Sequence, residues 1–189
     1  MNWENFRETR NGTTENAMSP PISSETTTVS KEVDANHVLI ITDFFNAITY
    51  PDTSIDDLNS FDSFSVLFQS NTKALSVARG RVSCSVIVTP AIANFFNGLH
   101  GGAVASIAER VSMACVKTIV PEDKPLFLGE LSMSYLCSAP VSCEVLVEAS
   151  VVRSGRNLSM VTVEFKIKET MKVTYLARAT FYHSLTSKL

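Results

Sequence analysis

A predicted helix over residues 101–119 is the feature that most constrains how this sequence can fold. It carries few charges, and its apolar side chains lie on several sides, so the helix is expected to be buried on nearly every side. Four strand-like segments follow, at residues 126–136, 143–153, 158–168 and 173–184, with turn signals between them. One long buried helix followed by neighbouring antiparallel strands predicts an α+β domain whose sheet wraps around the helix.

The sequence before that helix is less regular. Residues 1–35 are rich in Ser, Thr, Asn and Glu. Such a segment buries too little apolar surface to offset chain entropy, so it is expected to form a flexible arm. A helix is predicted over residues 36–50, and short strands over 64–68 and 75–88. We expect the folded domain to occupy residues 36–186.

Composition excludes several classes of function. A net charge of -3 provides no basic surface for a phosphate backbone, so nucleic acid is not expected as a partner. No apolar run reaches the roughly 18 residues that a membrane-spanning helix needs. The three histidines lie far apart, and no C-x-x-C pair occurs, so we expect no metal or redox cofactor. We expect reduced, mostly buried thiols at Cys84, Cys115, Cys137 and Cys143.

The turn that opens the predicted helix carries the strongest chemical signal. From Asn94 to Gly102 it reads Asn-Phe-Phe-Asn-Gly-Leu-His-Gly-Gly. Backbone N–H groups at such a helix start lie at the positive end of the helix dipole and can stabilise an oxyanion. Further along the helix, Glu109 has no cation three or four positions away. Because an unpaired acid on an apolar helix is costly, the pattern indicates that Glu109 acts as a base or nucleophile.

Each of these residues also has a structural interpretation. Glu109 could be a solvated helix acid with no role in chemistry. His100 could fasten the turn instead of contacting a substrate, and the two glycines after it could simply permit tight packing. Asn97 competes with Asn94 as the candidate site asparagine, but Asn97 could merely supply a turn, and the spacing favours Asn94.

Together, Asn94, the Gly98–Gly102 turn, Glu109 and the Ser154–Arg156 hairpin resemble the hotdog-fold acyl-CoA thioesterases. The similarity is greatest to the branch related to phenylacetate-degradation and 4-hydroxybenzoyl-CoA thioesterases, and it covers roughly residues 36–185. It implies a hotdog fold and hydrolysis of a fatty-acyl-CoA or aryl-CoA thioester to the free acid and coenzyme A. It also implies a homodimer, or a dimer of dimers, with active sites at the dimer interface.

The resemblance also assigns roles to residues. Glu109 falls on the family acid, and Gly101 on the glycine whose backbone N–H polarises the thioester carbonyl. Asn94 matches the residue that orients this carbonyl, and His100 and Gly102 complete the turn. The hairpin lies where family members bind the phosphates of coenzyme A. Its residues are Arg153, Ser154, Gly155, Arg156 and Asn157.

One departure from the family pattern concerns the attacking water. Many relatives place a Ser or Thr on the strand after the central helix, but residues 126–130 contain no hydroxyl before Ser132. Another branch uses a Thr one turn beyond the acid, where this chain has Met113 with Ser112 beside it. Two alternatives therefore stay open beside the general thioesterase. One is an aromatic thioesterase of the 1,4-dihydroxy-2-naphthoyl-CoA type, and the other is a non-catalytic acyl-CoA-binding protein.

Helix geometry gives an independent reason to expect a shared site. Gly101 and Glu109 are eight residues apart, which is about 12 Å along a helix. The Glu109 side chain cannot reach a carbonyl held at the start of its own helix. If both groups act on one thioester, they come from different subunits, and a two-fold axis creates two equivalent sites.

The sequence ends in Ser187-Lys188-Leu189. This tripeptide is the address that a peroxisomal import receptor reads at a C-terminus. We therefore expect that receptor as a partner and the peroxisome as the location.

Overall fold

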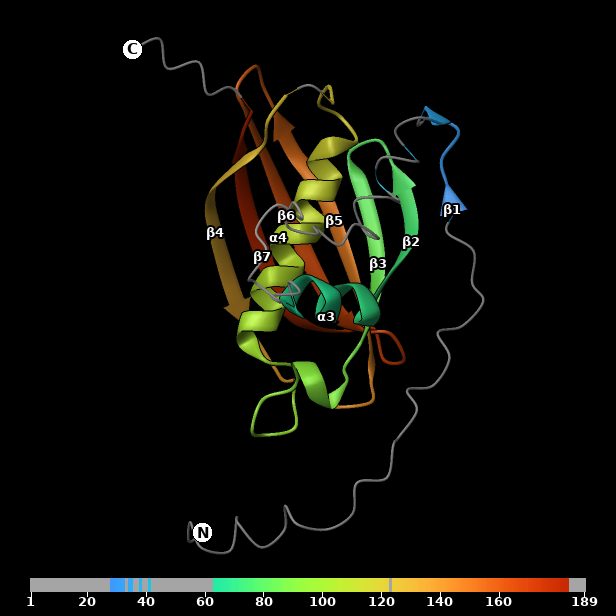
Figure 1. Cartoon of the computed structure of the whole chain (residues 1–189), viewed down its shortest axis with the longest axis vertical. Helices are drawn as coiled ribbons and strands as arrows, with labels where there is room; N and C mark the ends of the chain where they lie inside the picture. Colours follow the sequence, from blue (N-terminus) through green and yellow to red (C-terminus); the bar gives the residue numbers. More distant parts are fainter. Residues whose placement is uncertain are drawn as a thin grey trace, which may run out of the picture.

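The computed structural model describes residues 28–32, 34, 35, 38, 41, 63–122 and 124–183. In chain order its elements are β1 (Thr28–Val29), α3 (Ser63–Asn71), β2 (Thr72–Ala78), β3 (Arg81–Ile87), the 3₁₀ helix η1 (Pro90–Ile92), α4 (Gly101–Lys117), β4 (Phe127–Tyr135), β5 (Glu144–Ser154), β6 (Leu158–Ile167) and β7 (Lys172–Tyr182) (Figure 1).

The seven strands form one sheet in the order β1-β2-β3-β5-β6-β7-β4. All neighbouring pairs are antiparallel except β1 and β2, which run parallel. Strands β5, β6 and β7 form a meander, and β4 pairs with β7 at one edge of the sheet. The other side of β4 pairs with no strand among the described residues.

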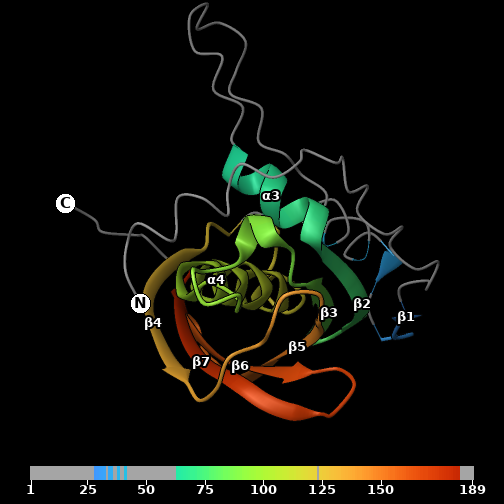
Figure 2. The same cartoon turned by 90° about the horizontal axis from the view of Figure 1, so that it is seen from below.

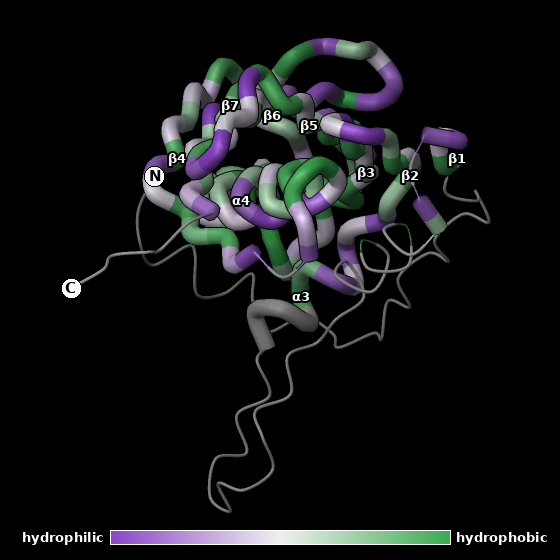
Figure 3. The backbone as a smooth tube through the Cα atoms, turned by 90° about the horizontal axis from the view of Figure 1, so that it is seen from above, coloured by the Kyte–Doolittle hydropathy of each residue, from purple (hydrophilic) through white to green (hydrophobic). Residues whose placement is uncertain are grey.

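Helix α4 lies inside the curve of this sheet. Viewed along the helix, the strands curl around it in the sheet order β2-β3-β5-β6-β7-β4 (Figure 2). Polar and apolar residues alternate along these strands, as expected for a sheet with one face on the core (Figure 3). On β6, for example, Val161, Val163 and Phe165 are fully buried, while Glu164 between them is exposed. The α+β prediction of a sheet wrapped around a long central helix is therefore confirmed.

The predicted central helix and the four strands after it are all present, with ends within about two residues of the structure. Two earlier predictions were wrong. Residues 64–68 lie in helix α3, not in a strand. A five-residue apolar run does not by itself distinguish a strand from a helix turn.

The single strand predicted over residues 75–88 is two strands, β2 and β3, joined by a tight turn. Gly80 sits in this turn with φ of 72°, a conformation that glycine adopts at little cost. The turn also changes which side chains face the core, because Val77 and Val82 pair across it and both are buried.

The sheet begins inside the segment expected to be a flexible arm. Thr28 and Val29 extend the edge of β2, and the Ser30 N–H donates to the Val77 carbonyl at 3.0 Å. From the helix predicted over 36–50, Val38 and Ile41 are described, both helical, with Ile41 fully buried. The remainder of that helix, residues 1–27 and the terminal tripeptide lie outside the described residues. Within the described part, no helix is long and apolar enough to cross a membrane.

Candidate active site

The loop before α4 is shaped by Asn94. Its Oδ1 accepts hydrogen bonds from the N–H groups of Phe96 (2.9 Å) and Gly98 (3.1 Å). Asn97 has a positive φ of 58° and so provides the reversal of the chain. A Cβ at Gly98 would collide with the Ser138 hydroxyl as it lies here, so glycine lets the two segments approach closely. The turn role thus falls to Asn97, while the Nδ2 group of Asn94 has no hydrogen-bond partner within the described structure.

His100 is the residue that caps α4. Its Nδ1 accepts a hydrogen bond from the Gly102 N–H at 3.0 Å, as an Asn or Ser side chain does at many helix starts. The structure therefore supports the interpretation in which His100 fastens the turn. It also occupies the Gly102 N–H, so this group is not free to bind a substrate.

The Gly101 N–H is a second backbone donor at the start of α4. It has no hydrogen-bond partner among the described residues, and it lies at the positive end of the α4 dipole. Gly101 is half-buried under the ring of Tyr135, whose Cε1 would lie 3.5 Å from a Cβ at this position. A carbonyl oxygen could approach this N–H because glycine has no side chain to cover it.

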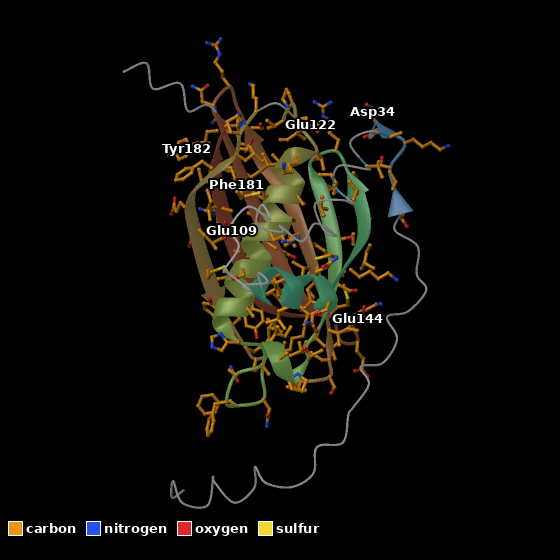
Figure 4. The ribbon with its side chains drawn as sticks, viewed as in Figure 1. Asp34, Glu109, Glu122, Glu144, Phe181 and Tyr182 are labelled. Atoms are coloured by element: carbon orange, nitrogen blue, oxygen red, sulfur yellow. The ribbon has the colours of Figure 1, made fainter. Side chains whose placement is uncertain are left out.

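Glu109 lies midway along α4 (Figure 4). It is half-buried, as are Ala105 and Ser106 on the same side of α4, while Met113 one turn further on packs against the hydrophobic core. Its carboxylate makes no ion pair or hydrogen bond with any described residue. The acid is thus available for chemistry on the face of α4 that points away from the sheet.

Neither Ser112 nor Ser132 is suitably placed to supply the missing hydroxyl. Ser112 is fully buried, and its Oγ has no hydrogen-bond partner within the described residues. Ser132 pairs with Arg178 across β4 and β7, and both are exposed while the neighbouring Leu131 packs against the core. Neither serine hydroxyl reaches the side of α4 that carries Glu109.

The Tyr135 hydroxyl does contact the turn, although the sequence did not predict it. Tyr135, at the end of β4, donates a hydrogen bond through its hydroxyl to the Gly101 carbonyl at 3.1 Å. The two residues are 34 positions apart. No local pattern connects them, because the contact depends on how β4 pairs with β7 beside the start of α4.

The hairpin of residues 153–157 does not lie near Gly101 in the same chain. Leu158, just after the hairpin, pairs with Tyr182, and Tyr182 pairs with Phe127 at the start of β4. Gly101 instead contacts Tyr135 at the other end of β4. The hairpin and the helix start are therefore at opposite ends of the domain (Figure 1).

A chain of polar side chains, buried at Ser159 and His183, supports this hairpin. The Ser154 and Ser159 hydroxyls are 2.7 Å apart, and the Ser159 hydroxyl is 3.0 Å from Nε2 of His183. Ser159 and His183 are buried, while the arginines at 153 and 156 are exposed to solvent. Hydrogen bonds thus hold the backbone of the hairpin in place, while its two arginine side chains are exposed to solvent.

The cysteines do not provide a nucleophile at this site. Burial raises the pKa of Cys84 and of Cys115 to about 12, so both are neutral thiols in the core. Cys137 and Cys143 are half-buried, and none of the four forms a disulfide. The described residues also contain no cluster of His, Cys, Asp and Glu that could hold a metal ion.

Comparison with known proteins agrees with this geometry. Residues 96–174 match the family model of the thioesterase superfamily. Human acyl-coenzyme A thioesterase 13 is 27% identical over 107 residues, which is 56% of this chain and 75% of that protein. Zebrafish thioesterase superfamily member 2 superposes with a TM-score of 0.63 at 23% identity, over 77% of this chain and 96% of that one.

A bacterial structure belongs to the branch expected from the sequence. The Escherichia coli PaaI protein, from the phenylacetic acid degradation operon, superposes with a TM-score of 0.54 at 16% identity. The match covers 59% of this chain and 82% of that one. The fold is therefore the hotdog fold. Over residues 96–174 the chain is similar to the thioesterase superfamily, a class of thioester hydrolases.

Proposed function

We propose that the protein hydrolyses an acyl-CoA thioester to the free acid and coenzyme A. The observation that carries this proposal is a pair of groups on α4 that have no partner among the described residues, the Gly101 N–H at its start and the Glu109 carboxylate at its middle. One is an electrostatic donor for a developing oxyanion, and the other is a base without a structural partner. The resemblance to human acyl-coenzyme A thioesterase 13 supports coenzyme A as the thiol.

In the reaction the Gly101 N–H binds the thioester carbonyl oxygen, and the Nδ2 group of Asn94 helps to orient it. Water attacks the carbonyl carbon while Glu109 takes up one of its protons. The carbon–sulfur bond then breaks, and the proton passes to the departing thiolate, which leaves as coenzyme A. Attack by the Glu109 carboxylate itself, through an anhydride that water later opens, gives the same products.

The site is completed by a second copy of the chain. Gly101 and Glu109 are about 12 Å apart along α4, too far to act on one carbonyl. Strand β4, nine residues long, has an edge that pairs with no described strand, and the side chains of Phe127, Tyr135 and Leu136 at its ends are exposed. Unpaired strand edges of this length are usually covered in native proteins.

An antiparallel pairing of two β4 edges has a further consequence. It brings the start of one β4 beside the end of the other, and so the hairpin of one subunit beside Gly101 of its partner. Arg153 and Arg156 can then bind the phosphates of a coenzyme A whose thioester lies at the partner's helix start. The minimal unit is a homodimer, and a dimer of dimers is compatible with it.

An aromatic acyl group is the second candidate substrate. Phe95 and Phe96 directly follow Asn94, their rings meet edge to face at 5.5 Å, and both are largely exposed. An aryl group could pack on this pair through the same geometry. A thioester of the 1,4-dihydroxy-2-naphthoyl-CoA type therefore belongs in any substrate panel.

Release of free thiol across a panel of acyl-CoA and aryl-CoA substrates tests the proposal. A purified protein that releases thiol from at least one class with normal saturation supports it. A protein that binds acyl-CoA but releases no thiol from any of them is a binding protein on the same fold, and the proposal fails.

We also propose that the protein is imported into peroxisomes through Ser187-Lys188-Leu189. Deletion of the tripeptide should move an N-terminally tagged fluorescent fusion from punctate organelles to the cytosol and leave thioesterase activity unchanged. A full-length fusion that is already diffuse would contradict the proposed location.

A further inference from the structure

Two tyrosines on neighbouring strands meet beside the helix start. Tyr135 on β4 and Tyr175 on β7 are direct cross-strand partners, and their rings pack edge to face at 5.8 Å. Tyr175 is buried and makes a second edge-to-face contact, at 5.7 Å, with Phe165 on β6. This packing fixes both rings, and therefore the positions of both hydroxyls.

The two hydroxyls act on the residues on either side of His100, one directly and the other through Ala139. The Tyr135 hydroxyl donates to the Gly101 carbonyl at 3.1 Å. The Tyr175 hydroxyl accepts from the Ala139 N–H at 3.0 Å, and the Ala139 carbonyl accepts from the Leu99 N–H at 2.8 Å. One tyrosine thus holds the residue after His100 directly, and the other holds the residue before it through a single intervening residue, Ala139.

The peptide bond between His100 and Gly101 carries the free N–H. Its direction depends on the backbone on both sides, and a glycine on one side allows it to rotate easily. An oxyanion donor is effective because it already points at the position where charge develops. Fixing Leu99 and the Gly101 carbonyl removes the freedom that would let the N–H turn away.

We propose that Tyr135 and Tyr175 are positioning residues of the thioesterase reaction, holding the Gly101 N–H in the direction that binds the carbonyl oxygen. This inference rests on the proposed function. Tyr175 is almost fully buried, so it acts on the turn through the residues that its hydroxyl contacts, among them Ala139, and not by touching the substrate. Burial also raises the pKa of the Tyr175 hydroxyl, which favours its neutral form.

Removal of each hydroxyl tests the proposal, and the chain offers a matched control. Tyr135→Phe and Tyr175→Phe should each lower kcat on the order of 10-fold with KM within about twofold, because a shifted donor weakens transition-state binding more than ground-state binding. Tyr182→Phe makes the same chemical change at the far end of β4, where the hydroxyl has no hydrogen bond to a described residue. Its kcat and KM should stay within about twofold of wild type.

A second readout does not depend on activity. The chain has seven glycines, so selective labelling with [¹⁵N]glycine gives a simple amide spectrum. In Tyr135→Phe and Tyr175→Phe the amide signals of Gly101 and Gly102 should shift, while those of Gly80 and Gly155 should not. In Tyr182→Phe the signals of Gly101 and Gly102 should keep their positions.

The outcomes separate this inference from the proposed function. If the wild-type protein releases no thiol but the glycine signals shift as described, the proposed function fails and the positioning of the turn stands. If the wild-type protein is active and either tyrosine variant keeps its kcat within about twofold, the inference is overturned. A loss of activity that matches the loss of folded protein, with the glycine signals unchanged, also overturns it.

Discussion

The Nδ1 atom of His100 lies 3.0 Å from the Gly102 nitrogen and accepts its hydrogen bond. Two adjacent glycines therefore differ in their backbone N–H groups. The Gly102 N–H is bound by the helix cap, while the Gly101 N–H has no hydrogen-bond partner among the described residues. The bond to the Gly102 N–H depends on an unprotonated Nδ1, since a protonated ring nitrogen cannot accept a hydrogen bond.

His100→Ala should therefore weaken the start of α4. Loss of a helix-capping acceptor typically costs about 1 kcal/mol of stability. His100→Asn retains a side-chain oxygen that can accept from the Gly102 N–H, and it should recover most of this loss. Urea unfolding of the three proteins measures the difference. Equal stability of the Ala and Asn variants would show that the capping bond contributes nothing.

Mixing two inactive variants should restore activity if the site is shared between subunits. Glu109→Ala lacks the base, and Gly101→Val covers the N–H that binds the carbonyl. After random subunit exchange half of the dimers are mixed, and each mixed dimer has one intact site, so about a quarter of the activity should return. A mixture that stays inactive despite proven exchange would place both groups in one subunit.

The arginines of the hairpin should affect coenzyme A substrates selectively. The double variant Arg153→Ala/Arg156→Ala should raise KM for an acyl-CoA on the order of 10-fold, since each charge-assisted phosphate contact contributes to binding. The same acyl group on N-acetylcysteamine, which has no phosphate, should show an unchanged kcat/KM. Arg178→Ala, an exposed arginine on β7, provides the control. Equal effects on both substrates would exclude a phosphate site at the hairpin.

Stability should fall in alkaline solution because of the buried thiols. Burial raises the pKa of Cys84 from 9.0 to about 12, so the folded state binds this proton more tightly than the unfolded chain. The stabilisation is complete below pH 9 and is lost as the pH rises toward 12, by at most about 1.4 kcal/mol per pH unit. The stability difference between wild type and Cys84→Ala should therefore shrink between pH 8 and pH 10.5 in urea unfolding. A constant difference would show that the thiol ionises equally in both states.

The sequence predicted the central helix and the last four strands because their side chains repeat with clear periods. Residues 64–68 were misassigned because a short apolar run has no measurable period. The break at Gly80 had a signal, since the buried positions change from odd at Val77 to even at Val82. The change spans only a few residues, and the longer alternation after Val82 makes residues 75–88 look like one strand.

The candidate site could be predicted only in part, for a related reason. Gly101, Glu109 and Asn94 lie close together in the sequence, and their chemistry follows from one turn and one helix. Tyr135 and Tyr175 reach the same turn from strands that are distant along the chain. Their contribution depends on the register of β4 against β7, which local patterns do not determine.

The most direct measurement is the turnover of Glu109→Gln in a thiol-release assay. This variant keeps the size of the side chain but removes the basic carboxylate, so kcat should fall on the order of 100-fold or more while KM changes little. Glu169→Gln, at an exposed acid in the turn between β6 and β7, should retain wild-type kcat. A Glu109→Gln enzyme with near wild-type turnover would show that another group activates the water and that Glu109 is not the catalytic base.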